Sequence, residues 1–238
     1  MKTFLLHRDV YACRTDDGSV LMDLRTGRYF GLDLRSTLAL VPRIEGWAGN
    51  YNINGDLPPD ANESDKLIEA LMNGPALLTD SPRLGKSATF PVLRQTSCIP
   101  FRGNIVPPPL VRAHHVSAFC WAYLRALFDV ECRPLAATVQ RIQTRKSKHA
   151  LEMPDTERIT ELVRVFRFLR PLFYTAKDRC LLDSLALVEF LAKFDAFPTW
   201  VIAVRTRPFA AHSWVLSDTL LLNERLETAE EFVPILAV

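Results

Sequence analysis

Cys180 and His212 are the two side chains with which this sequence can do covalent chemistry. Cys180 stands in the segment DRCLLDS at 178–184, and His212 follows in PFAAHSWV at 208–215. A thiol attacks a carbonyl carbon at neutral pH only as the thiolate, which needs a positive helix end or an imidazolium beside it. The two segments predict both aids, and they indicate chemistry through a covalent acyl-enzyme.

A helix and a sheet must bring these side chains together. Asp178 is a good N-cap, so Cys180 is expected in the first turn of a helix that runs to Phe194, where unpaired backbone N–H groups favour negative charge. His212 stands between two β-type runs, 200–204 and 213–216, and can return across a sheet to the helix end. The helix has an apolar stripe with the thiol at its N-terminal end, formed by Leu181, Ser184, Leu187, Val188 and Leu191.

Burial in the core is the alternative role for Cys180. Free cysteine is among the most often buried residue types, and the chain has four others without a pattern, Cys13, Cys98, Cys120 and Cys132. A core cysteine can occupy the same place at the start of a helix, so spacing alone leaves both roles open.

A family resemblance favours the catalytic role. The segments CLLDSLAL (180–187), VIAVRTRPF (201–209) and HSWV (212–215), with Asn223, resemble the B proteins of lasso-peptide biosynthesis. These are transglutaminase-like cysteine peptidases that remove the leader from a ribosomally made precursor. The resemblance implies that Cys180 is the nucleophile, that His212 is the general base and acid, and that an Asp directly after the Asn orients the imidazole.

The third catalytic residue departs from that pattern, because Glu224 follows Asn223. A glutamate can orient a histidine with one more methylene, as some hydrolase triads show. Asp218 is the competing acid, in an expected hairpin turn at 217–219 between strands 213–216 and 220–223. A second departure is Leu216, where the family often has Glu.

Composition limits the classes of function. The chain has 238 residues and a formal charge of +2, which argues against a nucleic-acid binder that depends on a strong general field, although 141–149 is a local basic run. No signal-peptide core, membrane span, zinc spacing or nucleotide-binding motif is visible, so no cofactor is expected. Five unpatterned cysteines fit a reducing cytoplasm.

Residues 1–80 are expected to form a small domain. Three short strands, 10–14, 19–24 and 28–33, precede helices at about 36–41 and 64–72. This order resembles the PqqD-like leader-recognition domain fused to the peptidase in one branch of the lasso B proteins, although many winged-helix domains share it. Such a domain would bind the leader as an added strand, and the residues expected to contact it are Arg28, Tyr29, Phe30, Leu32, Leu67 and Leu71.

The remaining chain divides into a linker and a second domain. Residues 81–109 are rich in proline and are expected to form a linker that packs on one domain. Residues 110–238 are expected to form the peptidase domain, with helices at about 112–128, 135–143 and 155–169 before the Cys180 helix. The fold class is therefore α+β, with a small winged-helix-like, PqqD-like domain followed by a transglutaminase-like or papain-like cysteine peptidase domain.

The resemblance also implies a reaction and partners. The protein would bind a precursor peptide through its leader and cleave it through a Cys-His-acid acyl-enzyme, and an ATP-dependent, asparagine-synthetase-like cyclase would act with it. Two other functions remain open: a Cys-His acyltransferase whose acyl-enzyme reacts with an amine, and a non-catalytic adaptor that delivers peptides.

Overall fold

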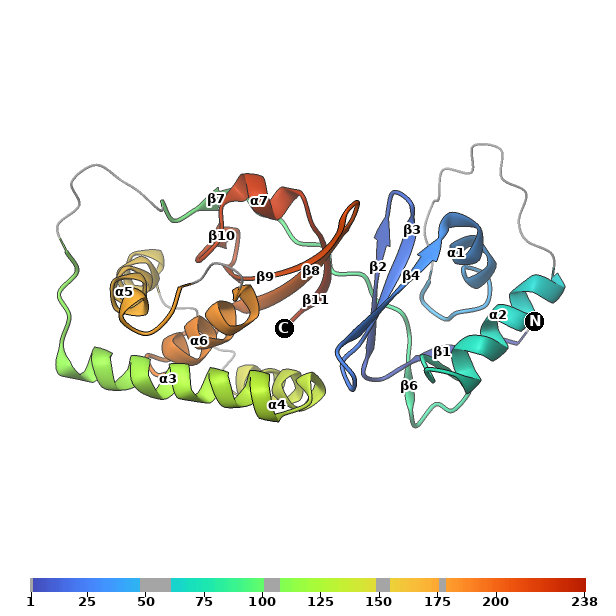
Figure 1. Cartoon of the computed structure of the whole chain (residues 1–238), viewed down its shortest axis with the longest axis horizontal. Coiled ribbons are helices and arrows are strands. Elements are labelled where there is room, and N and C mark those ends of the chain that lie inside the picture. Colours follow the sequence, from blue (N-terminus) through green and yellow to red (C-terminus); the bar gives the residue numbers. More distant parts are fainter. Residues whose placement is uncertain (1, 48–60, 101–107, 149–154, 176–178) are drawn as a thin grey trace. The chain divides into compact units, whose positions relative to one another are not determined.

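The structure is a computed structural model that describes residues 2–47, 61–100, 108–148, 155–175 and 179–238 (Figure 1). Contacts between residues divide the chain into two compact units. Unit 1 comprises Met1–Pro91 with Val204–Phe209 and Val233–Ile235; unit 2 comprises Val92–Ala203, Ala210–Phe232 and Leu236–Val238.

Unit 1 is built on an antiparallel sheet in the order β2-β3-β4. The three predicted strands are confirmed as β2 (Val10–Thr15), β3 (Gly18–Asp23) and β4 (Arg28–Asp33). Gly18 permits the tight turn between β2 and β3, since its φ is +144° and a Cβ there would lie 2.1 Å from the carbonyl oxygen of Leu32. β3 is the central strand of this sheet and is buried along its length.

Two helices and a second small sheet complete unit 1. Asp33 caps α1 (Leu34–Leu40) by accepting a hydrogen bond from the backbone N–H of Ser36 at 2.8 Å. The second helix, α2, extends over Ala61–Asn73. The small sheet has the order β5-β1-β6 and is formed by β1 (Leu5–His7), β5 (Leu78–Thr79) and β6 (Gly85–Lys86).

Unit 2 places one deeply buried helix, α6 (Cys180–Ala192), among other helices and a sheet. Residues Leu182–Leu191 are buried, as expected for a helix that is apolar on nearly every side. The other helices begin within one residue of their predicted starts but extend further in two cases: α3 (Ala113–Cys132), α4 (Leu135–Lys148) and α5 (Thr156–Leu169), which continues into η1 (Arg170–Leu172).

The sheet has the order β11-β8-β9-β10-β7. Its strands are β7 (Ser97–Cys98), β8 (Thr199–Thr206), β9 (Phe209–Ser217), β10 (Leu220–Leu221) and β11 (Val233–Ala237), and α7 (Leu226–Glu230) precedes β11. The hairpin between β9 and β10 is confirmed, with Ser217 opposite Leu220. The pairing of β7 parallel to β10 was not predicted and brings part of the proline-rich segment into the sheet.

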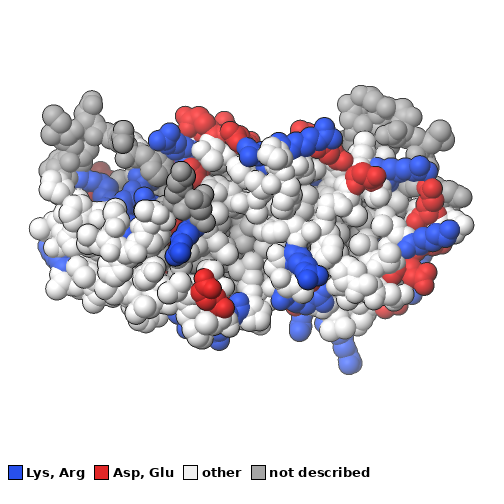
Figure 2. All heavy atoms as spheres, viewed as in Figure 1, with Lys and Arg blue, Asp and Glu red and all other residues white. Residues whose placement is uncertain are grey.

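Among the described residues on the face that Figure 2 shows, acidic and basic side chains are interspersed. Within the described residues, no helix is long and apolar enough to cross a membrane. The described residues also include no group of three or more His, Cys, Asp and Glu side chains arranged to hold a metal ion.

Candidate active site

Cys180 is the first residue of α6, as the sequence predicts. The predicted N-cap Asp178 lies outside the described residues; the N-cap position belongs to Arg179, whose side chain makes no capping bond, so that prediction is corrected. The sulfur of Cys180 therefore lies at the N-terminal end of the helix, where the backbone N–H groups favour negative charge. Burial raises the pKa of the Cys180 thiol, but a hydrogen bond and charge attraction from His212, with backbone bonds from Ser213 and Leu181, bring it below its ordinary value.

His212 lies within β9 and not between two strands as the sequence suggested. Its Nε2 atom is 2.5 Å from Oε2 of Glu224. Burial lowers the pKa of His212, but hydrogen bonds to Cys180 and Glu224 and the negative charges of both raise it to about 9. The imidazole is therefore held as imidazolium at neutral pH when the sulfur is a thiolate.

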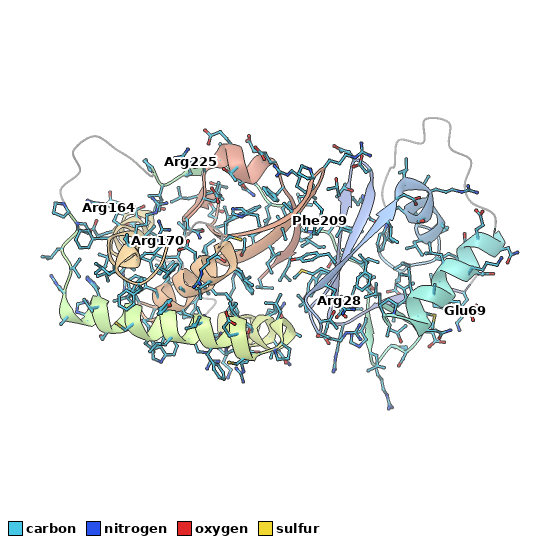
Figure 3. All side chains as sticks on the ribbon, viewed as in Figure 1. Arg28, Glu69, Arg164, Arg170, Phe209 and Arg225 are labelled. Atoms are coloured by element: carbon cyan, nitrogen blue, oxygen red, sulfur yellow. The ribbon has the colours of Figure 1, made fainter. Side chains whose placement is uncertain are left out.

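Glu224 is the acid that the structure brings to the imidazole. Burial raises the pKa of its carboxyl, but the hydrogen bond to His212, a backbone bond from Arg225 at 2.8 Å and the charge of His212 lower it below its ordinary value. Arg225, labelled in Figure 3, begins the turn into α7. Asp218, the competing candidate, lies at the turn between β9 and β10 with a φ of +53°.

The three side chains can serve as a nucleophile, a proton carrier and an orienting acid. Because Nε2 of His212 faces Glu224, Nδ1 is the ring nitrogen left to exchange a proton with Cys180. A carboxylate on one ring nitrogen fixes the tautomer and stabilises the imidazolium, as in serine and cysteine hydrolase triads. The arrangement can therefore form a thiolate at neutral pH and return a proton to a leaving group.

A buried hydroxyl pair connects the helix that carries the thiol to the strand that carries the histidine. Ser184, one turn after Cys180, lies 2.6 Å from Ser213 between their hydroxyl oxygens. Trp200 in β8 donates its indole N–H to both, at 3.1 Å and 2.8 Å, and Ser213 donates to the carbonyl oxygen of Val201 at 2.9 Å. Buried polar networks with satisfied partners fix one arrangement of the elements that they connect.

Arg167 at the end of α5 holds the segment before Asn223. Its guanidinium donates to the carbonyl oxygens of Leu222 at 2.6 Å, Ile99 at 3.2 Å and Pro100 at 2.9 Å. Burial and the charge of Arg170 lower the pKa of Arg167 to about 10, so it stays charged at neutral pH. No sequence pattern predicts this role, because backbone carbonyl acceptors are common to all residue types.

Residues 120–237 match the Transglutaminase-like superfamily model, which spans α6, β8, β9 and the segment after β10. The chain carries a transglutaminase-like domain. Its presence indicates a cysteine-based hydrolase or acyltransferase, which agrees with a thiol and an imidazole that share a proton. Neither a curated protein nor a solved structure matches the chain.

The residues predicted to bind a leader lie in unit 1, apart in sequence from the transglutaminase-like domain. Arg28, labelled in Figure 3, is exposed on β4, and Tyr29 is half-buried there. Phe30, Leu32 and Leu67 are partly buried against the core of the unit. Leu71 is only 7% exposed and belongs to that core, so it packs inward and offers a ligand little surface.

A small cavity lies between α1 and α2. Its volume is about 220 Å3, and Leu67 lines it with Arg35, Ser36, Ala39 and Glu63. Arg35 and Glu63, which both line it, form an ion pair of 2.7 Å. Of the predicted leader-binding residues, Leu67 is the one that lines this cavity.

Proposed function

We propose that this protein is a leader peptidase of lasso-peptide biosynthesis, which binds a ribosomally made precursor and cleaves it after the leader. The observation that carries the proposal is the thiol of Cys180 hydrogen-bonded to an imidazole that Glu224 orients at 2.5 Å. The adaptor alternative depended on a decayed site, and this geometry argues against it.

The proposed reaction proceeds through an acyl-enzyme. The Cys180 thiolate attacks the carbonyl carbon at the end of the leader, and the backbone N–H of Cys180 is one donor to the oxyanion that forms. The imidazolium of His212 gives its proton to the leaving amine as the C–N bond breaks. Water then attacks the thioester with His212 as base, which releases the leader as an acid and restores the thiol and imidazole.

Unit 1 would bind the leader in the manner of a PqqD-like domain. Within the described residues, β4 pairs with β3 on one side only, so its outer edge offers backbone groups to an added strand. The cavity beside Leu67 would take one side chain of that strand. A leader held on the same polypeptide has a high effective concentration at the protease site, so that site needs little selectivity of its own.

The proposed partners are the precursor peptide and an ATP-dependent, asparagine-synthetase-like cyclase. The amine freed by cleavage is the group that a cyclase would join to an Asp or Glu side chain after ATP activates that carboxyl. ATP would then serve the partner, and the peptidase itself would use no cofactor. We propose a cytoplasmic location because precursor and ATP are both made available there.

The test is incubation of the full-length protein with a lasso-type precursor peptide, followed by mass spectrometry of the products. The proposal predicts a free leader acid and a core peptide with a free amine. A leader joined to an amine would instead identify an acyltransferase, and an uncleaved but bound precursor would identify an adaptor.

Leader capture has its own test. Proline placed in the leader segment that pairs with β4 removes a ladder donor, and we expect roughly tenfold weaker binding to the full-length protein by calorimetry. Alanine at the same leader position is the control, since it keeps the backbone N–H. Equal binding of the proline and alanine peptides would contradict strand addition.

A further inference from the structure

The carboxylate of Asp183 is buried in the same helix turn as the proposed nucleophile. Asp183 lies three residues after Cys180 in α6 and is 2% exposed. Removing a carboxylate from water costs several kcal/mol unless charged and hydrogen-bonding partners compensate for it. An apolar side chain in this helix would avoid that cost, so the partners of Asp183 indicate what its presence achieves.

Three side chains from two segments donate to Asp183: Arg170 and Tyr174 belong to η1 and the turn after it, and Asn223 follows β10. Tyr174 donates its hydroxyl to Oδ1 at 3.0 Å, and Arg170, labelled in Figure 3, donates to Oδ1 and Oδ2 at 3.2 Å and 3.4 Å. Asn223 donates its side-chain amide N–H to Oδ2 at 3.0 Å. The guanidinium balances the buried charge, and the amide extends the network toward the site.

Asn223 links this carboxylate to both partners of the nucleophile. Its side-chain oxygen accepts the backbone N–H of Val215 at 2.8 Å, three residues after His212 in β9. Its own backbone continues directly into Glu224, which hydrogen-bonds the imidazole. A single buried amide therefore connects the helix of Cys180 to the strand of His212 and to the segment of Glu224.

We infer that Asp183 is a positioning residue, which through Asn223 sets the distance between the thiol of Cys180 and the imidazole-carboxylate pair of His212 and Glu224. The inference rests on the proposed role of this site in peptide cleavage. Asp183 itself exchanges no proton with the substrate. Its effect is exerted on the thiolate, because a displaced imidazole stabilises the thiolate less well.

The polarity of the Asp183-Asn223 contact allows a sharp test. In Asp183→Asn, an amide can turn an N–H toward the N–H of Asn223, which leaves both donors without an acceptor. In Asn223→Asp, two carboxylates face each other. The double variant Asp183→Asn with Asn223→Asp restores one donor and one acceptor, so it should recover part of what each single variant loses.

The experiment measures the rate of Cys180 alkylation by iodoacetamide in the full-length protein from pH 5 to pH 10, with the labelled residue identified by mass spectrometry. We expect Asp183→Asn and Asn223→Ala to lower the rate at pH 6.5 roughly ten- to a hundredfold and to move the rise in rate to higher pH. The double variant should react faster than Asp183→Asn.

Glu189→Gln is the matched control, because Glu189 is also a buried, arginine-bound carboxylate of α6. A folded Glu189→Gln protein should keep the wild-type alkylation profile. If Asp183→Asn does not fold, the alkylation profile of Asn223→Ala tests the inference instead, since this variant leaves the Asp183-Arg170 pair in place. Wild-type alkylation profiles in folded Asp183→Asn or Asn223→Ala would overturn the inference.

Alkylation needs no peptide, so the two proposals fail separately. A wild-type protein that alkylates rapidly but does not cleave the precursor would contradict the leader peptidase and leave the positioning role standing. A protein that cleaves the precursor with an unchanged rate in Asp183→Asn would contradict the positioning role alone.

Discussion

Helix α6 carries two buried carboxylates, Asp183 and Glu189, and their contacts differ in what they connect. Asp183 near the N-terminal end connects the helix to Asn223 and so to the segment of Glu224. Glu189 is bound by Arg141 at 2.7 Å and Arg145 at 2.8 Å, both from α4. Arg141 also contacts Asp129 of α3. The same pairing chemistry therefore positions reacting groups at one end and holds three helices together further along.

The comparison teaches that a buried charge does not mark an active site by itself. Burial raises the pKa of the Glu189 carboxyl, but hydrogen bonds and charge attraction from Arg145 and Arg141 lower it below its ordinary value. A lowered pKa therefore occurs both at Glu189 and at Cys180. What distinguishes the N-terminal end of α6 is a thiol at a helix start that faces an imidazole.

The largest effect is expected at the catalytic end. Cys180→Ala and His212→Ala remove the nucleophile and the proton carrier, so each should lower precursor cleavage by more than about a thousandfold while the leader still binds. Cleavage assays and calorimetry measure the two properties. Alanine variants of Cys13, Cys98, Cys120 and Cys132 are the controls, and near wild-type cleavage without Cys180 would remove it from the mechanism.

A smaller loss is expected for the orienting acid. Glu224→Gln keeps the shape but removes the charge that stabilises the imidazolium, so cleavage should fall by roughly a hundredfold or more. Asp218→Asn should be nearly silent, because Asp218 lies at the tip of the hairpin. The opposite ranking in a steady-state assay would transfer the orienting role to Asp218.

The carboxylate of Glu189 should affect the stability of the fold and not the rate of cleavage. Glu189→Gln leaves Arg141 and Arg145 with a neutral partner in a buried place, which should lower the free energy of unfolding by about 3 kcal/mol. Urea unfolding measures this change. Loss of cleavage in the folded variant, beyond what its unfolded fraction explains, would contradict the division of roles along α6.

The pH dependence of stability should differ between the wild type and Glu189→Gln. The folded-state pKa of Glu189 is below its ordinary value of 4.5, so its contribution is present above about that pH and is lost as pH falls through the folded pKa. Glu189→Gln should therefore lose less stability than the wild type as the pH is lowered below 4.5. Parallel acid unfolding curves for the two proteins would show that Glu189 does not cause the loss of stability below pH 4.5.

Much of the framework follows from local sequence. The strands of unit 1 and the helices α3 to α6 have strong periodic patterns and polar ends, and each was predicted to within a few residues except at the C-terminal ends of α3 and α4. The pairing of β7 with β10 was not predicted, because a two-residue strand in a proline-rich segment has no period of its own.

Part of the site could also be predicted from local sequence. Cys180, His212 and Glu224 follow from residue type and a family pattern, and the structure places the three side chains together. Asp183 and Asn223 were not assigned a role, since their contact joins residues 40 apart in sequence. The available signal was a carboxylate in the first turn of an otherwise apolar helix, which asks for a buried partner.

The most direct measurement of the central claim is competitive alkylation of the five cysteines at pH 6.5, read residue by residue by mass spectrometry. Cys132 is exposed, whereas Cys180 is half-buried, so accessibility alone would make Cys132 react before Cys180. The account predicts that Cys180 reacts first and that His212→Ala abolishes this preference. Labelling of Cys132 ahead of Cys180 in the wild type would contradict an activated thiolate at the start of α6.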